Sequence, residues 1–226
     1  MKRMLGPLVV VAGLMLVVYL ILTYVPIKPL LPDLPTQGNS AQVTVARINA
    51  ETATYVVNAE YPQFGIPAID TQIQRAVEEA VAEFESYPAN PPDSATPQNE
   101  FTGTFDKIYV GSDIVSFELI LSQYTGGAHP MTLLSGMNFD RATGRLLLPD
   151  DAFKLVGKTV RQVSEEATAQ FEQKFGDAFF ADGANSNPEN FSSFTIAADE
   201  VTFIFQAYQV AAYAAGPQTI SFARVH

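Results

Sequence analysis

An uncharged apolar run near the N-terminus constrains this chain more than any other feature. It spans residues 4–25 and reads MLGPLVVVAGLMLVVYLILTYV. At 1.5 Å rise per residue, a helix of this length crosses a hydrocarbon core of about 30 Å. The run is longer than a usual signal-peptide core and no small-x-small cleavage site follows it. We therefore expect an uncleaved transmembrane signal anchor rather than a removed signal peptide.

The charges around this run predict its orientation. Lys2 and Arg3 precede it, so the positive-inside rule places residues 1–3 in the cytoplasm as a short tail. All 24 Asp and Glu residues follow it. We expect a single-pass membrane protein whose acidic remainder lies outside the cytoplasm.

The composition excludes several classes of function. The chain has no cysteine, which excludes disulfide frameworks, thiolate metal sites and cysteine nucleophiles. It has two histidines, His129 and His226, which are too few for histidine-rich metal catalysis. The formal net charge of −11 disfavours binding to nucleic acid. We expect no metal centre and no cofactor.

Proline spacing separates the apolar run from a folded domain. Pro26, Pro29, Pro32 and Pro35 lie in residues 26–40, where they favour extended polyproline II structure. This segment is predicted to be a stalk. Residues 41–226 then form the folded part, which has enough residues for a sizeable core.

Hydrophobic periodicity predicts an α+β fold for residues 41–226. Apolar residues recur at steps of three and four in 66–84 and again in 159–175, which is typical of amphipathic helices. Alternating patterns predict strands in the remaining segments. They span 41–49, 52–61, 101–110, 113–123, 132–140, 191–196, 201–206 and 219–225. Short connections favour antiparallel pairing, so two helices are expected to pack on antiparallel sheet.

The segment YTGGAHP at 124–130 is the first candidate site. Gly126 and Gly127 allow positive φ or close approach, and Pro130 fixes the direction in which the chain leaves. A histidine in this setting, His129, suits a general base or a ligand contact. The alternative is a tight turn in which His129 serves only the backbone. Tyr124 begins the segment and is a further candidate contact.

Other candidate chemistry is less specific. Tyr208 and Tyr213 could present rings to a carbohydrate or a protein, although core tyrosines would give the same pattern. Asp140 is a carboxylate that could work with His129 as acid and base on a glycan. No G-x-S-x-G elbow selects a nucleophilic serine. Asp150 and Asp151 are predicted to cap a short helix.

Several separated motifs occur together in this chain. They are YTGGAHP (124–130), NFDRATG (138–144), LLLPDDAF (146–153), NFSSF (190–194), FIFQAYQV (203–210) and YAAGP (213–217). In this order they resemble a bacterial extracytoplasmic domain-of-unknown-function family. That family is shared by the ectodomain of the lysozyme-sensing anti-sigma factor RsiV and the N-terminal region of the peptidoglycan deacetylase PdaC. The resemblance covers residues 117–226, with 41–116 as its companion segment.

The resemblance implies binding rather than catalysis. In the anti-sigma factor this domain is a lysozyme receptor, whereas the deacetylase chemistry belongs to a separate domain that needs an Asp and two His residues. The present chain has one internal histidine, and residues 1–3 leave no room for a sigma-binding domain. The resemblance also implies a bacterial inner or cytoplasmic membrane, with residues 41–226 periplasmic or extracellular.

These observations lead to one expected function and two alternatives. We expect a non-catalytic binding domain that recognises a cationic secreted protein such as a lysozyme, or peptidoglycan. The candidate contacts are Tyr124, Gly126, Gly127, His129, Asp140, Tyr208 and Tyr213. One alternative is an envelope glycan hydrolase that uses His129 with a carboxylate such as Asp140. The other is a structural subunit of an envelope complex, which would expose a large apolar patch.

Overall fold

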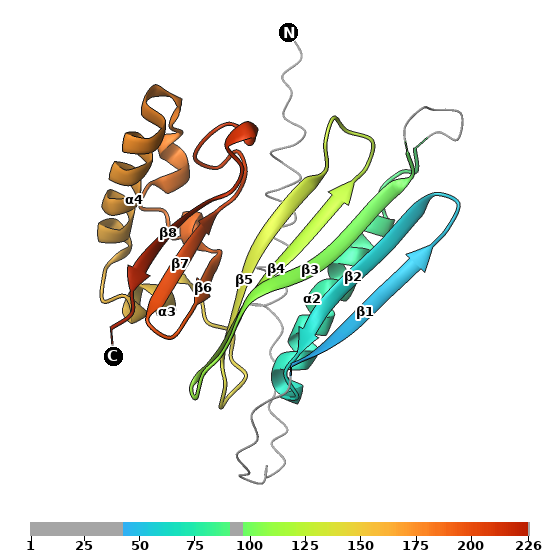
Figure 1. The fold of residues 1–226 in the computed structure, drawn as a ribbon, viewed down its shortest axis with the longest axis horizontal. Helices are drawn as coiled ribbons and strands as arrows, with labels where there is room; N and C mark the ends of the chain where they lie inside the picture. Colours follow the sequence, from blue (N-terminus) through green and yellow to red (C-terminus); the bar gives the residue numbers. More distant parts are fainter. Residues whose placement is uncertain (1–42, 91–96, 226) are drawn as a thin grey trace.

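The computed structural model describes residues 43–90 and 97–225, which form two β-sheets with three α-helices (Figure 1). The expected fold class, α+β, is confirmed. The predicted membrane anchor, cytoplasmic tail and stalk lie outside the described residues. Within those residues, none of the helices combines the length and the hydropathy that a bilayer crossing requires.

The first sheet has five strands in sequence order. They are β1 (Thr44–Glu51), β2 (Tyr55–Gln63), β3 (Asn99–Val110), β4 (Ile114–Tyr124) and β5 (Met131–Asp140). Neighbours are antiparallel except β2 and β3, which are parallel. The prediction of antiparallel pairing throughout is wrong at this one pair. Helix α2 (Pro67–Glu85) connects β2 to β3. It is long enough to carry the chain back to the end of the sheet where β2 begins, so β3 starts there and runs parallel to β2.

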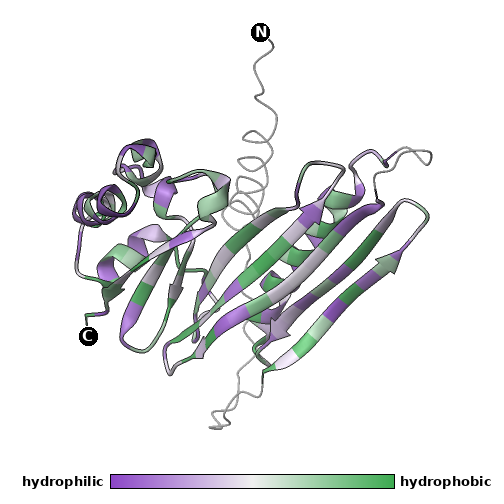
Figure 2. Cartoon of the chain, turned by 45° about the horizontal axis from the view of Figure 1, so that its top comes forward, coloured by the Kyte–Doolittle hydropathy of each residue, from purple (hydrophilic) through white to green (hydrophobic). Residues whose placement is uncertain are grey.

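Helix α2 covers one face of the five-stranded sheet (Figure 1). Its buried stripe is the one that the periodicity predicts: Ile69, Ile73, Ala76, Val77, Ala80, Val81 and Phe84. These side chains pack on the inward residues of the strands, among them Val57, Phe101, Phe117 and Phe139. Hydrophobic and hydrophilic residues alternate along most of these strands (Figure 2), whereas the first half of β4 is buried on both faces.

The second sheet has three antiparallel strands, β6 (Phe194–Ile196), β7 (Glu200–Phe205) and β8 (Gln218–Ala223). Helices α3 (Pro149–Leu155) and α4 (Val160–Phe175) pack on it. The core between them is rich in phenylalanine: Phe153, Phe171, Phe191, Phe194, Phe203, Phe205 and Phe222. Short 3-10 turns η1 (Gly176–Ala178), η2 (Ala181–Ala184), η3 (Pro188–Phe191) and η4 (Tyr213–Ala215) complete the chain. The strand predicted from residue 191 starts only at 194, because Pro188 initiates the turn η3.

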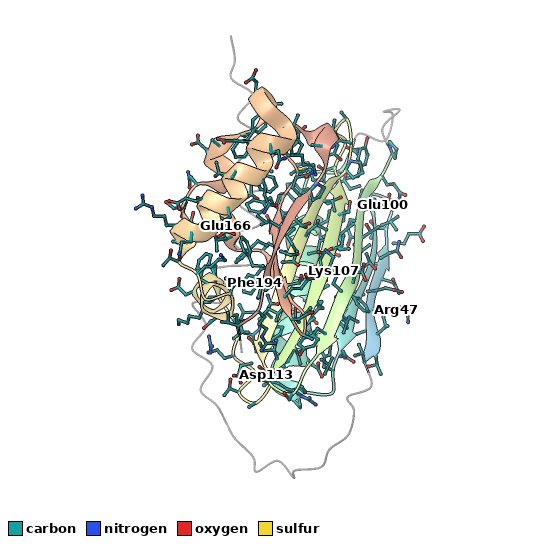
Figure 3. All side chains as sticks on the ribbon, turned by 60° about the vertical axis from the view of Figure 1, so that its left-hand side comes forward. Arg47, Glu100, Lys107, Asp113, Glu166 and Phe194 are labelled. Atoms are coloured by element: carbon teal, nitrogen blue, oxygen red, sulfur yellow. The ribbon has the colours of Figure 1, made fainter. Side chains whose placement is uncertain are left out.

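The two sheets are joined by hydrogen bonds across β6, which lies against β4 and β5 on the face away from α2. The Ile196 amide donates to Ser116 Oγ (2.8 Å), and Asn138 Nδ2 donates to the Phe194 carbonyl (2.6 Å). Figure 3 shows Phe194 on this strand in front of the larger sheet. At the end of β8, Arg224 Nη2 pairs with Asp113 Oδ2 at 2.7 Å. Buried polar side chains of the first sheet therefore satisfy the backbone of the second.

Candidate functional site

Three of the candidate residues meet in one cluster. His129 comes from one segment, and Tyr208 and Tyr213 come from another that lies about eighty positions later in the sequence. The His129 ring stacks on the Tyr213 ring with centroids 3.7 Å apart and 16° between the planes. The Tyr208 ring lies 5.2 Å from that of Tyr213 and 6.5 Å from that of His129. The β4–β5 connection supplies His129 and the β7–β8 connection supplies the tyrosines, at the same end of the molecule (Figure 1). We call His129, Tyr208 and Tyr213 the aromatic cluster.

The turn between β4 and β5 positions His129 through its backbone. Gly126 has a φ of 94°, which a residue with a side chain rarely adopts, so the turn requires glycine there. The Pro130 carbonyl accepts a hydrogen bond from Tyr213 Oη at 3.3 Å and lies 2.9 Å from His129 Nδ1. Because a carbonyl can only accept, Nδ1 is the donor in this contact. His129 Nε2 is the ring nitrogen that this contact leaves available to a ligand.

The β7–β8 connection holds Tyr208 in an unusual backbone conformation. Tyr208 has a φ of 70°, and the residue is 48% exposed. Gln209 supports this conformation: its Oε1 accepts from the Gln206 amide, and its Nε2 donates to the carbonyls of Gly183 and Asn190, each at 2.9 Å. A positive φ at a tyrosine costs free energy, so the surrounding hydrogen bonds must impose it. The result is an exposed aromatic ring on a fixed backbone.

Gln206 explains why the two connections meet. Its Oε1 accepts from the Leu134 amide at 3.0 Å and its Nε2 donates to the Leu134 carbonyl at 2.7 Å. The side-chain amide thus pairs with β5 much as a neighbouring strand would. This contact fixes the end of β7 against β5, close to where β5 begins. The sequence pattern did not identify Gln206 or Gln209, although both lie in the FIFQAYQV motif.

Asp140 lies at the far end of β5 from His129. The ten residues of β5 separate them, which corresponds to about 30 Å of extended strand. Asp140 instead accepts hydrogen bonds from the hydroxyl and the backbone amide of Thr143, and these contacts lower the pKa of its carboxyl group. Asp140, the carboxylate that the hydrolase alternative gave as an example, therefore does not pair with His129.

The remaining candidate residues flank the aromatic cluster. Tyr124 is the last residue of β4 and is half-buried. Gly126 and Gly127 are exposed in the turn that follows it. A cluster of three or more His, Cys, Asp or Glu side chains that could hold a metal ion does not occur within residues 43–90 and 97–225.

Two family matches cover most of the described chain. Residues 48–132 match the family described as "Deacetylase PdaC", and residues 150–224 match "Protein of unknown function (DUF3298)". Over these two ranges the chain is similar to PdaC-like and DUF3298 proteins. The family resemblance that the motifs indicate is thereby confirmed.

One curated relative and two solved structures give the scale of this similarity. The chain is 27% identical over 191 residues to the peptidoglycan-N-acetylmuramic acid deacetylase PdaC of Bacillus subtilis. This match covers 82% of the chain but 40% of that relative. Crystal structures of DUF3298 family proteins from Bacteroides fragilis and Pseudomonas aeruginosa match with TM-scores of 0.53 and 0.51, at 17% and 19% identity. They cover 82% and 81% of this chain and 92% of their own chains, which shows a shared fold.

Proposed function

We propose that this DUF3298/PdaC-like chain is a membrane-anchored, extracytoplasmic binding module that recognises peptidoglycan through its aromatic cluster. The observation that carries this proposal is the meeting of His129, Tyr208 and Tyr213 at the surface from two distant segments. Residues 4–25 would hold the module at the membrane. The module would act by binding and without catalysis.

The chemistry of the aromatic cluster suits a sugar ligand. A pyranose ring has C–H faces that pack on aromatic rings and hydroxyl groups that need hydrogen-bond partners. Tyr208 and Tyr213 combine an apolar ring with a polar hydroxyl. The stack on His129 and the hydrogen bond to Pro130 hold Tyr213 in place before a ligand arrives. Preorganisation of this kind reduces the entropic cost of binding.

The comparison with the Bacillus subtilis protein also supports an envelope glycan. The name of that relative includes peptidoglycan, and the PdaC family match includes Tyr124 and His129. The separation of Asp140 from His129 counts against the carboxylate that the hydrolase alternative gave as its example. A binding role needs only the surface that the aromatic cluster provides.

Charge favours a second candidate ligand, a cationic secreted protein such as a lysozyme. The net charge of −11 would attract a basic partner at long range and speed its association. Salt screens such attraction, so the affinity for a basic protein would fall steeply with ionic strength. Binding to a glycan through stacking and neutral hydrogen bonds would depend on salt much less.

Co-sedimentation with purified peptidoglycan tests the proposal and separates the two ligands. The full chain in detergent is mixed with peptidoglycan, or with lysozyme on beads, at low and high salt. Expected is retention on peptidoglycan at both salt concentrations, reduced about tenfold or more by His129→Ala or Tyr213→Ala because a stacked ring is lost. Ile108→Ala is the control. Ile108 is exposed and lies near the end of β3 that is opposite to the end beside Tyr124.

Each other outcome has a defined meaning. Binding of peptidoglycan that the His129 and Tyr213 variants retain in full would refute the role of the aromatic cluster. Binding of lysozyme alone, lost at high salt, would replace the glycan with the cationic protein. Release of soluble sugar products in the same samples would refute the non-catalytic role.

A further inference from the structure

The outer edge of β1 pairs with no other strand in the described part of the chain. β1 ends the five-stranded sheet, and Figure 1 shows it as the outermost strand on the side away from the second sheet. The opposite edge, β5, is covered instead, because Gln206 bonds to the Leu134 backbone and Ser193 Oγ accepts from the Gly136 amide. A free edge presents a row of backbone donors and acceptors that another strand can pair with.

The register of the β1–β2 hairpin shows which backbone groups of β1 point outward. The Thr52 amide donates to the Tyr55 carbonyl at 2.9 Å where the hairpin closes. Antiparallel strands bond through alternate residues, so Thr52 and every second residue before it direct their amides and carbonyls at β2. Pro62, which has no amide, fits this pattern because it lies opposite one of the intervening residues. The residues whose backbone groups point outward are Val45, Arg47, Asn49 and Glu51.

The side chains of β1 divide between two environments. Those of the outward-bonding residues are exposed, whereas Ala46, Ile48 and Ala50 are half-buried and pack against the core under α2. A second strand beside β1 would cover more of these three apolar side chains, which favours pairing.

The two charges on β1 favour an antiparallel partner with the same sequence. Arg47 and Glu51 are placed symmetrically about Asn49. When two copies of β1 run antiparallel with Asn49 opposite Asn49, Arg47 of each copy faces Glu51 of the other, and every facing residue bonds through outward-pointing backbone groups. Registers in which Arg47 faces Arg47, or Glu51 faces Glu51, are disfavoured by like charges.

Both charged groups have the capacity for this pairing. Arg47 Nε pairs with Glu60 Oε1 at 2.7 Å, and within residues 43–90 and 97–225 its two terminal nitrogens form no hydrogen bond. A guanidinium has enough N–H donors to bind a second carboxylate. Glu51 takes part in none of the ion pairs formed within those ranges. By contrast, the outer strand of the second sheet, β8, carries no charged side chain that would select a register.

We propose that two copies of this chain pair through β1 about a twofold axis at Asn49, which joins their five-stranded sheets into one continuous sheet. A twofold interface uses the same surface of both copies, which the self-complementary charges of β1 satisfy. The axis is perpendicular to the sheet, so both α2 helices lie on one face, where Ile48 of each copy meets Ala50 of the other. The aromatic cluster belongs to other connections, and the dimer would therefore carry two of them.

Sedimentation velocity of the full chain in detergent, with charge-reversed variants, tests the dimer. The parent is expected to be dimeric at micromolar concentration. Arg47→Glu and Glu51→Arg are each expected to weaken association at least about tenfold, because the twofold axis turns each substitution into two like-charge contacts. The double variant Arg47→Glu/Glu51→Arg is expected to restore association, since opposite charges then face each other again.

Two controls separate pairing of β1 from other effects. Glu60→Gln removes the partner of Arg47 within one chain and is expected to leave the dimer intact. Because the chain has no cysteine, Asn49→Cys creates a single thiol at the axis. A short bis-maleimide reagent is expected to cross-link two copies of this variant but not of Ile108→Cys, whose exposed position lies on β3.

The outcomes that would overturn the proposal are equally defined. A monomeric parent would do so, as would a dimer that both single reversals leave intact. A double variant that associates no better than the single reversals would place the effect inside one chain and would also contradict pairing between copies. Equal cross-linking of the Asn49 and Ile108 variants would exclude the axis at Asn49.

Discussion

Gly136 lies where β6 crosses β5, and its missing side chain makes that crossing possible. A Cβ atom added there would lie 1.6 Å from the Phe194 carbonyl oxygen and 2.7 Å from its nitrogen. The Gly136 amide also donates to Ser193 Oγ at 3.0 Å. The close approach of the two sheets therefore depends on a single residue without a Cβ.

Gly136→Ala is expected to destabilise the fold by about 3 kcal/mol, because backbone atoms would have to move apart. Urea unfolding followed by circular dichroism measures this change. Gly127→Ala is the matched control: its Cβ would meet only the His129 carbonyl at 3.6 Å, an ordinary contact. It is expected to change the free energy of unfolding by less than about 0.5 kcal/mol. Equal stability of the two variants would contradict the close packing of β6 on β5.

At the scale of single elements, the start of α3 is fixed by Asp151. The helix begins with Pro149, and Asp151 Oδ2 accepts a hydrogen bond from the Leu148 amide at 3.0 Å. The same oxygen lies 2.8 Å from Arg145 Nη1. Capping was predicted for Asp150 and Asp151 together, whereas only Asp151 makes these contacts. Its hydrogen bond to Arg145, aided by the Leu148 amide, holds the pKa of its carboxyl below the ordinary value of 3.8.

A lowered pKa in the folded state gives the pH dependence a definite sign. The contribution of Asp151 to stability is fully present above about pH 4, and it is lost as the pH falls through the folded-state pKa. Asp151→Asn is therefore expected to destabilise the protein by about 1 kcal/mol at pH 7 and by much less at pH 2. Thermal unfolding at both pH values measures the difference. Asp150→Asn is the control, since Asp150 is exposed; a deficit for Asp151→Asn that persists at low pH would contradict the assignment.

The elements that the sequence predicts well are those with a strong local pattern. The apolar stripe of α2 and the apolar repeat that predicted α4 both depend on residues three or four positions apart. The parallel pairing of β2 with β3 was not predicted, because it depends on where α2 returns the chain. The turn η3 was also missed, because the strand pattern at Phe191 resembles that of Phe194.

At the scale of the whole molecule, the candidate site depends on contacts between distant segments. His129, Tyr208 and Tyr213 were each chosen singly from local patterns, and their stacking could not be predicted because it depends on how Gln206 pairs with Leu134. Asp140 and His129 are near each other in sequence, but the length of β5 places them at opposite ends of that strand.

The NMR signals of the His129 ring, followed during addition of soluble peptidoglycan fragments, test the central claim most directly. The chain has two histidines, so selective ¹³C-histidine labelling gives a simple spectrum, and His129→Ala identifies the signal of interest. Stacking on Tyr213 makes that signal sensitive to any change in the aromatic cluster. The account predicts that the His129 signals shift in a saturable way as fragments bind. Fragment binding that leaves the His129 signals unchanged would contradict it.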